Sequence, residues 1–351
     1  MPHLTEVHLQ NYRSFLDAKC RLRPVTAVIG ANNAGKSSLL RGIISVVRGL
    51  RPDVRGLGSD VWMNDVWDCP FRSQKMKEAE VRLAAKGINK YGIEANAEVI
   101  RESLEKRQPG SSRSASGSSN LYIENIACFV LKDDCIGVAE SDSEQPFVHS
   151  SGEGVTRVLQ WLSLKKKKVF QSIEEEFRTY VPEVEELTFE RADQGKWFLQ
   201  VLEKGFEEPV SLTQLSAGTR TILALLTIIH QPNRPELILL EDIEHAIHPR
   251  GLAPLVETMR RMAKEHGVQF IFTTQSPYVL DCFQKPEYWD DVVIVEKKDG
   301  VSTLTNAKDR LVALGYEREM ENLPLGDLWY SGALGGVAGP NELWDEPESK
   351  L

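Results

Sequence analysis

The chain has 351 residues, 41% of them hydrophobic and 26% charged, which suits a globular protein with one large α/β domain or a domain carrying a sub-lobe. No run of about 18 apolar residues occurs, which excludes a transmembrane helix, and no secretory signal is visible. The net charge of −9 supplies no overall basic surface for duplex DNA, so nucleic-acid binding stays open. The 5 scattered cysteines form no C-x-x-C pair, which favours reduced thiols in a cytoplasmic protein.

The beginning of the chain predicts two strands and a helix. Apolar residues alternate from Leu4 to Leu9, as in a strand, and a turn follows over residues 11–15. A second strand covers Val25–Ile29 and runs into a glycine-rich turn. Apolar residues at helical spacing then predict a helix that begins at Lys36.

The middle of the chain has a weaker pattern. Residues 110–119 are rich in serine and glycine and predict a flexible excursion, and residues 121–131 predict a buried strand. One or two helices are expected over 155–180, followed by short strands near 187–189 and 197–201. The lysine run within the helical stretch favours a solvated helix face over a nucleic-acid site.

The last third alternates between helices and strands. A helix is expected from Ser216 to Ile229, followed by Leu237–Leu240, a continuous apolar strand of the kind that is buried on both faces of a parallel sheet. A helix over 251–266 and strands over 268–272 and 292–295 complete the pattern, with the last of these expected to be the final strand. Such alternation predicts a mostly parallel sheet with right-handed crossovers.

A phosphate-binding loop lies between the second strand and the first helix. The segment from Gly30 to Ser37 fits the pattern G-x-x-x-x-G-K-S, whose glycines let backbone N–H groups surround an anion at a helix N-terminus. Lys36 is expected to reach the β- and γ-phosphates of ATP, and the Ser37 hydroxyl to bind Mg²⁺. The predicted nucleotide-binding residues of this segment are Gly30, Asn32, Asn33, Ala34, Gly35, Lys36, Ser37 and Ser38.

Acidic residues follow the apolar strand that ends at Leu240. Charged side chains at the end of a core strand are costly unless they meet a cation or solvent. We therefore expect Glu241 to hold Mg²⁺, through water, and Asp242 to orient and polarise the attacking water. Glu244 is a competing candidate for the catalytic base. This pattern is weak alone and becomes strong together with the phosphate-binding loop.

The order of the motifs resembles that of ABC-type ATPase heads of the SMC/RecF/OLD-like branch. Leu215-Ser216-Ala217-Gly218-Thr219 precedes a helix and lies between the loop and the acids, and Thr273-Thr274-Gln275-Ser276-Pro277 follows a later strand. Residues 11–15 and 247–249 also look like segments of that branch. The resemblance implies an α/β P-loop head with a mostly parallel core sheet, an antiparallel N-terminal sheet and a helical sub-lobe.

The resemblance also implies that two heads enclose two nucleotides. Ser216 and Gly218 of one head would cover the γ-phosphate bound by the other, and Arg13 and Phe15 would lie near the adenine or the phosphates. Gln275 takes the switch position, where the family often has histidine. Asp242 is one methylene shorter than the usual glutamate, which predicts slow turnover. Ala217 replaces a common glycine and is tolerated if its φ is negative.

We expect residues 1–350 to form one head, with a nucleotide-binding core from 1–48 and 205–335 and a divergent sub-lobe from 49–204 that includes a helical segment over 153–182. The apolar, aromatic and glycine-rich tail over 325–336 either packs on its own head or forms a docking surface. It resembles the ends of small prokaryotic ATPases that are encoded beside a separate effector, often in phage defence.

The expected function is therefore an ATPase that associates with itself and controls a separate effector, which could be a TOPRIM-type nuclease. No fused nuclease is expected, because no acidic pair follows the strand that ends at Glu296. Two alternatives stay open: a RecF-like clamp on DNA, and a structural oligomer with little turnover.

Overall fold

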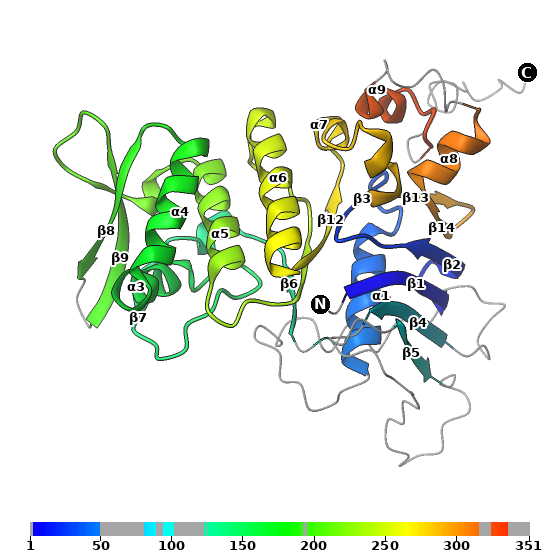
Figure 1. The fold of residues 1–351 in the computed structure, drawn as a ribbon, viewed down its shortest axis with the longest axis horizontal. Helices are drawn as coiled ribbons and strands as arrows, with labels where there is room; N and C mark the ends of the chain where they lie inside the picture. Colours follow the sequence, from blue (N-terminus) through cyan, green and yellow to red (C-terminus); the bar gives the residue numbers. More distant parts are fainter. Residues whose placement is uncertain are drawn as a thin grey trace, which may run out of the picture.

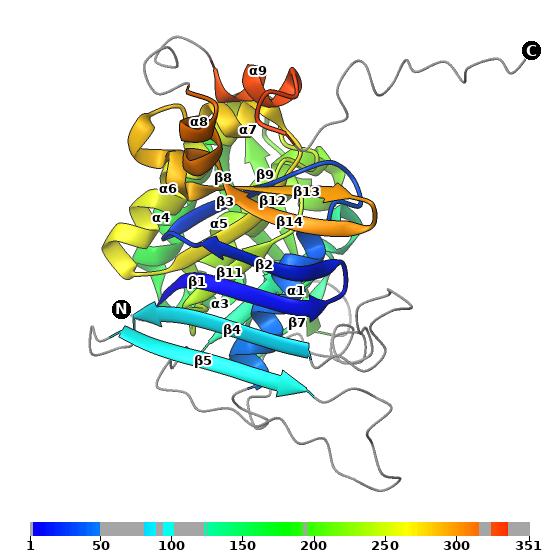
Figure 2. The same ribbon diagram turned by 90° about the vertical axis from the view of Figure 1, so that its right-hand side faces the viewer.

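The computed structural model describes residues 3–49, 81–88, 94–101, 123, 125–191, 195–315 and 324–335, so the predicted flexible segment 110–119 lies outside the described residues. Within this part, ten strands form one sheet in the order β5-β4-β1-β2-β14-β13-β3-β12-β11-β6 (Figures 1 and 2). The strands are β1 (His3–Tyr12), β2 (Phe15–Arg21), β3 (Val25–Ile29), β4 (Val81–Ile88), β5 (Glu94–Arg101), β6 (Ile126–Phe129), β11 (Leu237–Leu240), β12 (Gln269–Thr274), β13 (Val292–Lys298) and β14 (Val301–Asn306).

The sheet has a parallel part and an antiparallel part. Strands β6, β11, β12, β3 and β13 are parallel neighbours, whereas β2, β1, β4 and β5 pair in antiparallel fashion. Strand β14 joins the two parts, because it is antiparallel to β13 and parallel to β2. The predicted fold class is therefore confirmed, and the N-terminal antiparallel strands continue the core sheet.

Helices cover both faces of the parallel part. Successive side chains of a strand point to opposite faces, and in β11 Leu237 and Leu239 pack in one hydrophobic cluster while Ile238 and Leu240 pack in the other. Helix α1 lies in the first cluster, and α5, α6, α7 and α9 contribute to the second. All four residues of β11 are buried, as its unbroken apolar sequence predicts.

The helices of this core are α1 (Lys36–Gly49), α5 (Ala217–His230), α6 (Pro249–His266), α7 (Pro277–Asp281), α8 (Ala307–Ala313) and α9 (Leu325–Tyr330). None of the helices in the described ranges is both long and apolar enough to cross a membrane.

A second, smaller sheet lies at the opposite end of the molecule from β1 and β2 (Figure 1). It is antiparallel and carries two helices, which agrees with the one or two helices expected over 155–180. Its elements are β7 (Glu140–Ser141), α3 (Val155–Lys165), α4 (Lys167–Tyr180), β8 (Val184–Arg191), β9 (Lys196–Glu203) and β10 (Val210–Ser211).

A half-buried carboxylate joins this sub-lobe to the core. Glu176 of α4 accepts hydrogen bonds from Thr258 and Arg261 of α6, at 2.7 and 2.6 Å, and lies 3.2 Å from the His230 ring nitrogen of α5. Burial raises the pKa of Glu176, but these donors outweigh it and hold the pKa at about 2. Glu176 is therefore ionised at neutral pH and joins three helices.

Three boundaries differ from those predicted. The range 49–204 contributes β4, β5 and β6 to the large sheet as well as the small one, so its strands are not confined to a sub-lobe. The expected strand over 121–131 is short in the described part, at Ile126–Phe129. The expected final strand, β13, is followed by β14.

The tail packs on its own head. Leu325, Leu328 and Trp329 of α9 are at most 7% exposed and belong to the core cluster, whereas Tyr330 is 78% exposed. The Gly326 N–H donates to Asp281 Oδ1 at 3.0 Å, and a Cβ added to Gly326 would lie 2.5 Å from the Pro277 carbonyl oxygen of α7. Only glycine permits this approach between α9 and α7.

Replacing Gly326 with valine is expected to destabilise the protein by about 1 to 3 kcal/mol, because the new side chain would push α9 away from α7. Thermal unfolding of the purified variant measures this effect as a lowered midpoint. Tyr330→Ala changes an exposed residue of the same helix and should leave the midpoint unchanged. A Gly326→Val protein as stable as the wild type would contradict the close packing of the two helices.

Candidate nucleotide site

The loop over residues 30–37 lies between β3 and α1, as its pattern requires. Lys36 is only 7% exposed, and its Nζ donates to the carbonyl oxygens of Gly30 at 2.8 Å and Ala31 at 3.1 Å. Asn33 and Gly35 have φ values of 62° and 122°, in the left-handed region, which turns the chain sharply before the helix begins. The lysine ammonium is therefore held inside the curve of its own loop.

The turn between β1 and β2 packs against Gly35 of this loop. Phe15 is fully buried, and its ring edge lies 3.2 Å from the position that a Cβ of Gly35 would take. Phe15 therefore packs beneath the loop, and its expected place near the adenine or the phosphates stays a prediction. Arg13 lies in the turn itself, with a φ of 54°.

Glu241 meets the loop at the end of β11. The Ser37 hydroxyl donates to Glu241 Oε2 at 3.1 Å, while Oε1 is buried and has no hydrogen-bond partner among the described residues. Burial raises the pKa of Glu241, and the hydrogen bond from Ser37 opposes the rise. A buried carboxylate oxygen without a partner is costly and marks a position where a cation or donor would be favourable.

The next two acids are fixed by the strand beside β11. The backbone N–H of Asp242, whose φ is 48°, donates to the Thr273 hydroxyl oxygen at 2.9 Å. Glu244 Oε1 accepts from the Gln275 N–H at 2.7 Å, while Glu244 Oε2 is buried without a partner in the described part. Glu244 therefore ties the turn after β11 to Gln275, which directly follows β12, and keeps one oxygen available.

These groups share one electrostatic environment. Burial lowers the pKa of Lys36, whereas the charges of Asp242, Glu244 and Glu241 raise it. The loop lysine and the three acids, which lie more than 200 positions apart in the chain, thus form a single site. Oxygen donors with one positive side chain suit a magnesium-bound triphosphate.

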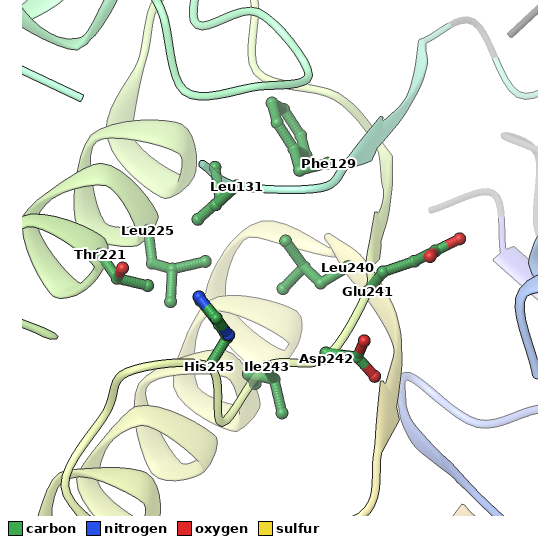
Figure 3. A pocket seen from close by; sticks show the side chains of 9 residues that line it. All are labelled: Phe129, Leu131, Thr221, Leu225, Leu240, Glu241, Asp242, Ile243 and His245. Carbon is green, nitrogen blue, oxygen red and sulfur yellow. The ribbon is translucent and has the colours of Figure 1, made fainter. Parts of the chain in front are cut away.

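A small hollow lies beside the acids but is not this site. Its volume is about 20 Å³, room for roughly one water molecule. Figure 3 shows the His245 ring directed toward Leu225 and Leu131, whereas the Glu241 and Asp242 carboxylates point away from it. No residue of the phosphate-binding loop lines the hollow, so we assign it no role in nucleotide binding.

The segment Leu215–Thr219 contains the beginning of α5. Ser216 caps α5 by accepting the Thr219 N–H at 3.1 Å, and a Cβ on Gly218 would collide with the Ala246 carbonyl oxygen. Ala217 begins the helix and is not among the described residues with positive φ, so alanine is tolerated there. Figure 1 shows α5 and α1 on opposite sides of α6. The helix that Ser216 caps therefore lies apart from the helix that follows the loop.

Two residues at the site were not assigned a role from sequence. Thr273 lies inside a segment that the sequence singled out, but its contact with Asp242 depends on the parallel pairing of β11 and β12. Ser302 lies in β14, which was not predicted, and its hydroxyl donates to the Ala34 carbonyl oxygen at 2.5 Å.

Two family models match the chain. One described as "AAA ATPase domain" matches residues 3–49, and one described as "AAA domain, putative AbiEii toxin, Type IV TA system" matches residues 148–281. A "putative ABC transporter ATP-binding protein" of Clostridium acetobutylicum is 26% identical over 93 residues. That match covers 26% of this chain and only 33% of the relative's length.

Solved structures of SMC heads share the fold. An SMC head bound to the C-winged helix domain of ScpA superposes with a TM-score of 0.54 at 14% identity, over 86% of this chain and 97% of that one. The Pyrococcus furiosus head with an extended coiled coil, bound to the C-terminal domain of ScpA, gives 0.52 at 14% identity, over 91% and 100% of the two chains. The shared architecture therefore extends well beyond the phosphate-binding loop.

Proposed function

We propose that this chain, an ABC-type ATPase head with the fold of SMC heads, binds ATP with Mg²⁺, hydrolyses it slowly and pairs with a second head when nucleotide is bound. The observation that carries this proposal is the buried, unpartnered oxygen of Glu241 beside the Ser37 hydroxyl and the Lys36 ammonium. Such a cluster is unfavourable in isolation and becomes favourable with a metal-bound phosphate.

The residues present fit a magnesium ion. Ser37 and Glu241 would hold it, since hydroxyl and carboxylate oxygens are its usual protein ligands. When bound, the ion would neutralise charge on the phosphates. Lys36 would exchange its bonds to Gly30 and Ala31 for bonds to phosphate oxygens, which keeps the buried ammonium satisfied.

Water attack requires a base near the terminal phosphate. Asp242 follows the metal-binding acid directly and is the first candidate, while Glu244, anchored through Gln275, is the second. A shorter side chain reaches less far toward a water molecule, which supports slow turnover. Release of phosphate from MgATP by the purified chain tests the proposal, and absence of both binding and release would overturn it.

Pairing of heads is supported by the position of α5. The Ser216 hydroxyl and the first N–H groups of this helix are an anion-binding arrangement, and α5 lies on the far side of α6 from α1, the helix that follows the loop. A second copy could place this helix end over the γ-phosphate. Two complete sites would then require two chains. The proposed location of this assembly is the cytoplasm of a prokaryotic cell.

We expect Ser216→Arg to leave the nucleotide affinity of a single head within about twofold and to abolish nucleotide-dependent pairing, because a bulky cation would fill the space meant for phosphate. Light scattering with a nonhydrolysable ATP analogue measures the mass. Ser172→Arg, on an exposed face of α4, is the matched control and should still pair. Pairing by the Ser216 variant would contradict this arrangement.

The finer proposal is control of a separate effector in anti-phage defence. Its support is indirect: the family model over 148–281 names a toxin of a two-part system, and the two SMC heads compared above are bound to a second protein. Copurification of the product of a neighbouring gene, identified by mass spectrometry, would support it. Salt-dependent binding of duplex DNA would instead favour the clamp, and stable assembly without turnover the structural oligomer.

A further inference from the structure

Ser302 lies directly under the phosphate-binding loop. It is 1% exposed, and its hydroxyl donates to the Ala34 carbonyl oxygen at 2.5 Å. Its backbone N–H donates to the Ser14 carbonyl oxygen at 2.7 Å, and the Ser14 and Ser302 hydroxyl oxygens are 2.8 Å apart. Strand β14 and the β1–β2 turn are thus bonded together beneath Gly35.

The bond to Ala34 fixes the orientation of one peptide group. The Ala34 carbonyl and the Gly35 N–H belong to the same planar trans peptide, so they point in opposite directions. With the carbonyl held on the side of Ser302, the Gly35 N–H faces the opposite side. A Cβ on Gly35 would lie 2.9 Å from the Ser302 hydroxyl oxygen, so the glycine lets the two backbones approach closely.

We propose that Ser302 is a positioning residue for the phosphate chain of a nucleoside di- or triphosphate. Its hydroxyl turns the Ala34–Gly35 peptide so that the Gly35 N–H can donate to a bound phosphate, and it prevents the peptide from rotating when the ligand leaves. This inference rests on the proposed nucleotide site and extends it to a strand, β14, that carries no recognised motif. Ser302 itself does not touch the ligand.

The test compares Ser302→Ala with the wild type by calorimetric titration of ATP and of ADP, and by steady-state hydrolysis. We expect the Kd of both nucleotides, and the KM for ATP, to rise about tenfold, since one hydrogen bond to a charged group is weakened. The kcat should stay within about twofold, because the hydroxyl is remote from the reacting atoms. Ser302→Thr, which keeps the hydroxyl and suits a strand, should restore the affinity.

Ser45→Ala is the matched control. Ser45 is 3% exposed and donates to the Arg41 carbonyl oxygen at 2.7 Å within α1, so its loss removes a buried serine bond without changing the loop. We expect wild-type affinity from this variant. Hydrogen exchange over residues 31–39 of the nucleotide-free protein gives a second measurement, and Ser302→Ala should exchange faster there than Ser45→Ala.

The outcomes separate the inference from the proposed function. A wild-type chain that binds neither nucleotide would overturn both. Wild-type binding together with unchanged affinity and unchanged exchange in Ser302→Ala would overturn the inference alone. Ser302→Ala could instead lose affinity together with an equal fall in kcat and a lowered unfolding midpoint, while Ser45→Ala shows none of these effects. That result would assign Ser302 a structural role and would likewise overturn the inference.

Discussion

Replacing Lys36 with alanine is expected to weaken nucleotide binding severely. The ammonium is the positive side chain that acts with Asp242, Glu244 and Glu241 inside the site, and it is buried within the loop. Removing a buried charge that pairs with phosphate costs about 2 to 5 kcal/mol, which corresponds to a loss of affinity on the order of 30- to 5,000-fold. Titration with a fluorescent ATP analogue measures the loss.

Lys308→Ala is the control for this prediction, since Lys308 is an exposed lysine of α8. Its affinity should equal that of the wild type. The unfolding midpoint of Lys36→Ala must also be recorded, because Lys36 donates to two loop carbonyl oxygens in the absence of ligand. A Lys36→Ala protein that binds ATP with wild-type affinity would place the nucleotide somewhere other than this loop.

The sequence predicted the parts of the site that depend on local patterns. A phosphate-binding loop needs glycines and a lysine at fixed spacing between a strand and a helix, and β3 and α1 have the expected limits at Val25–Ile29 and at Lys36. Strand β11 was equally clear, because a strand buried on both faces must be apolar throughout. Because β11 ends at Leu240, the positions of Glu241 and Asp242 directly after it could also be predicted.

Strand β14 was missed because part of its buried face is polar. The buried positions of β14 include Ser302 and Asn306, which serve hydrogen bonds to the loop and to Arg21, so the strand lacks the apolar alternation that identifies strands. The packing of Phe15 could not be predicted from local sequence either. Its aromatic ring suits either a base or a core, and only the tertiary packing decides that it lies under Gly35.

Replacing Asp242 with asparagine is expected to lower kcat by about 10²- to 10⁴-fold, the usual contribution of a general base, and to leave the Kd for ATP nearly unchanged. The backbone should accept the change, because asparagine tolerates the left-handed φ of 48° found at Asp242. Asp299→Asn is the matched control, because it makes the same substitution at a residue with a similar φ of 50°, at the tip of the β13–β14 hairpin. It should keep full activity. Single-turnover release of phosphate measures the chemical step.

Glu244→Gln distinguishes the two candidate bases. The amide oxygen of the glutamine can still accept the Gln275 N–H, so the turn after β11 keeps its link to Gln275. The buried oxygen without a partner becomes an NH₂ group. If Glu244 only holds Gln275 in place, this variant should lose much less activity than Asp242→Asn. The reverse order, with Asp242→Asn still active and Glu244→Gln inactive, would assign the base to Glu244, whose free oxygen would then receive the proton of the attacking water.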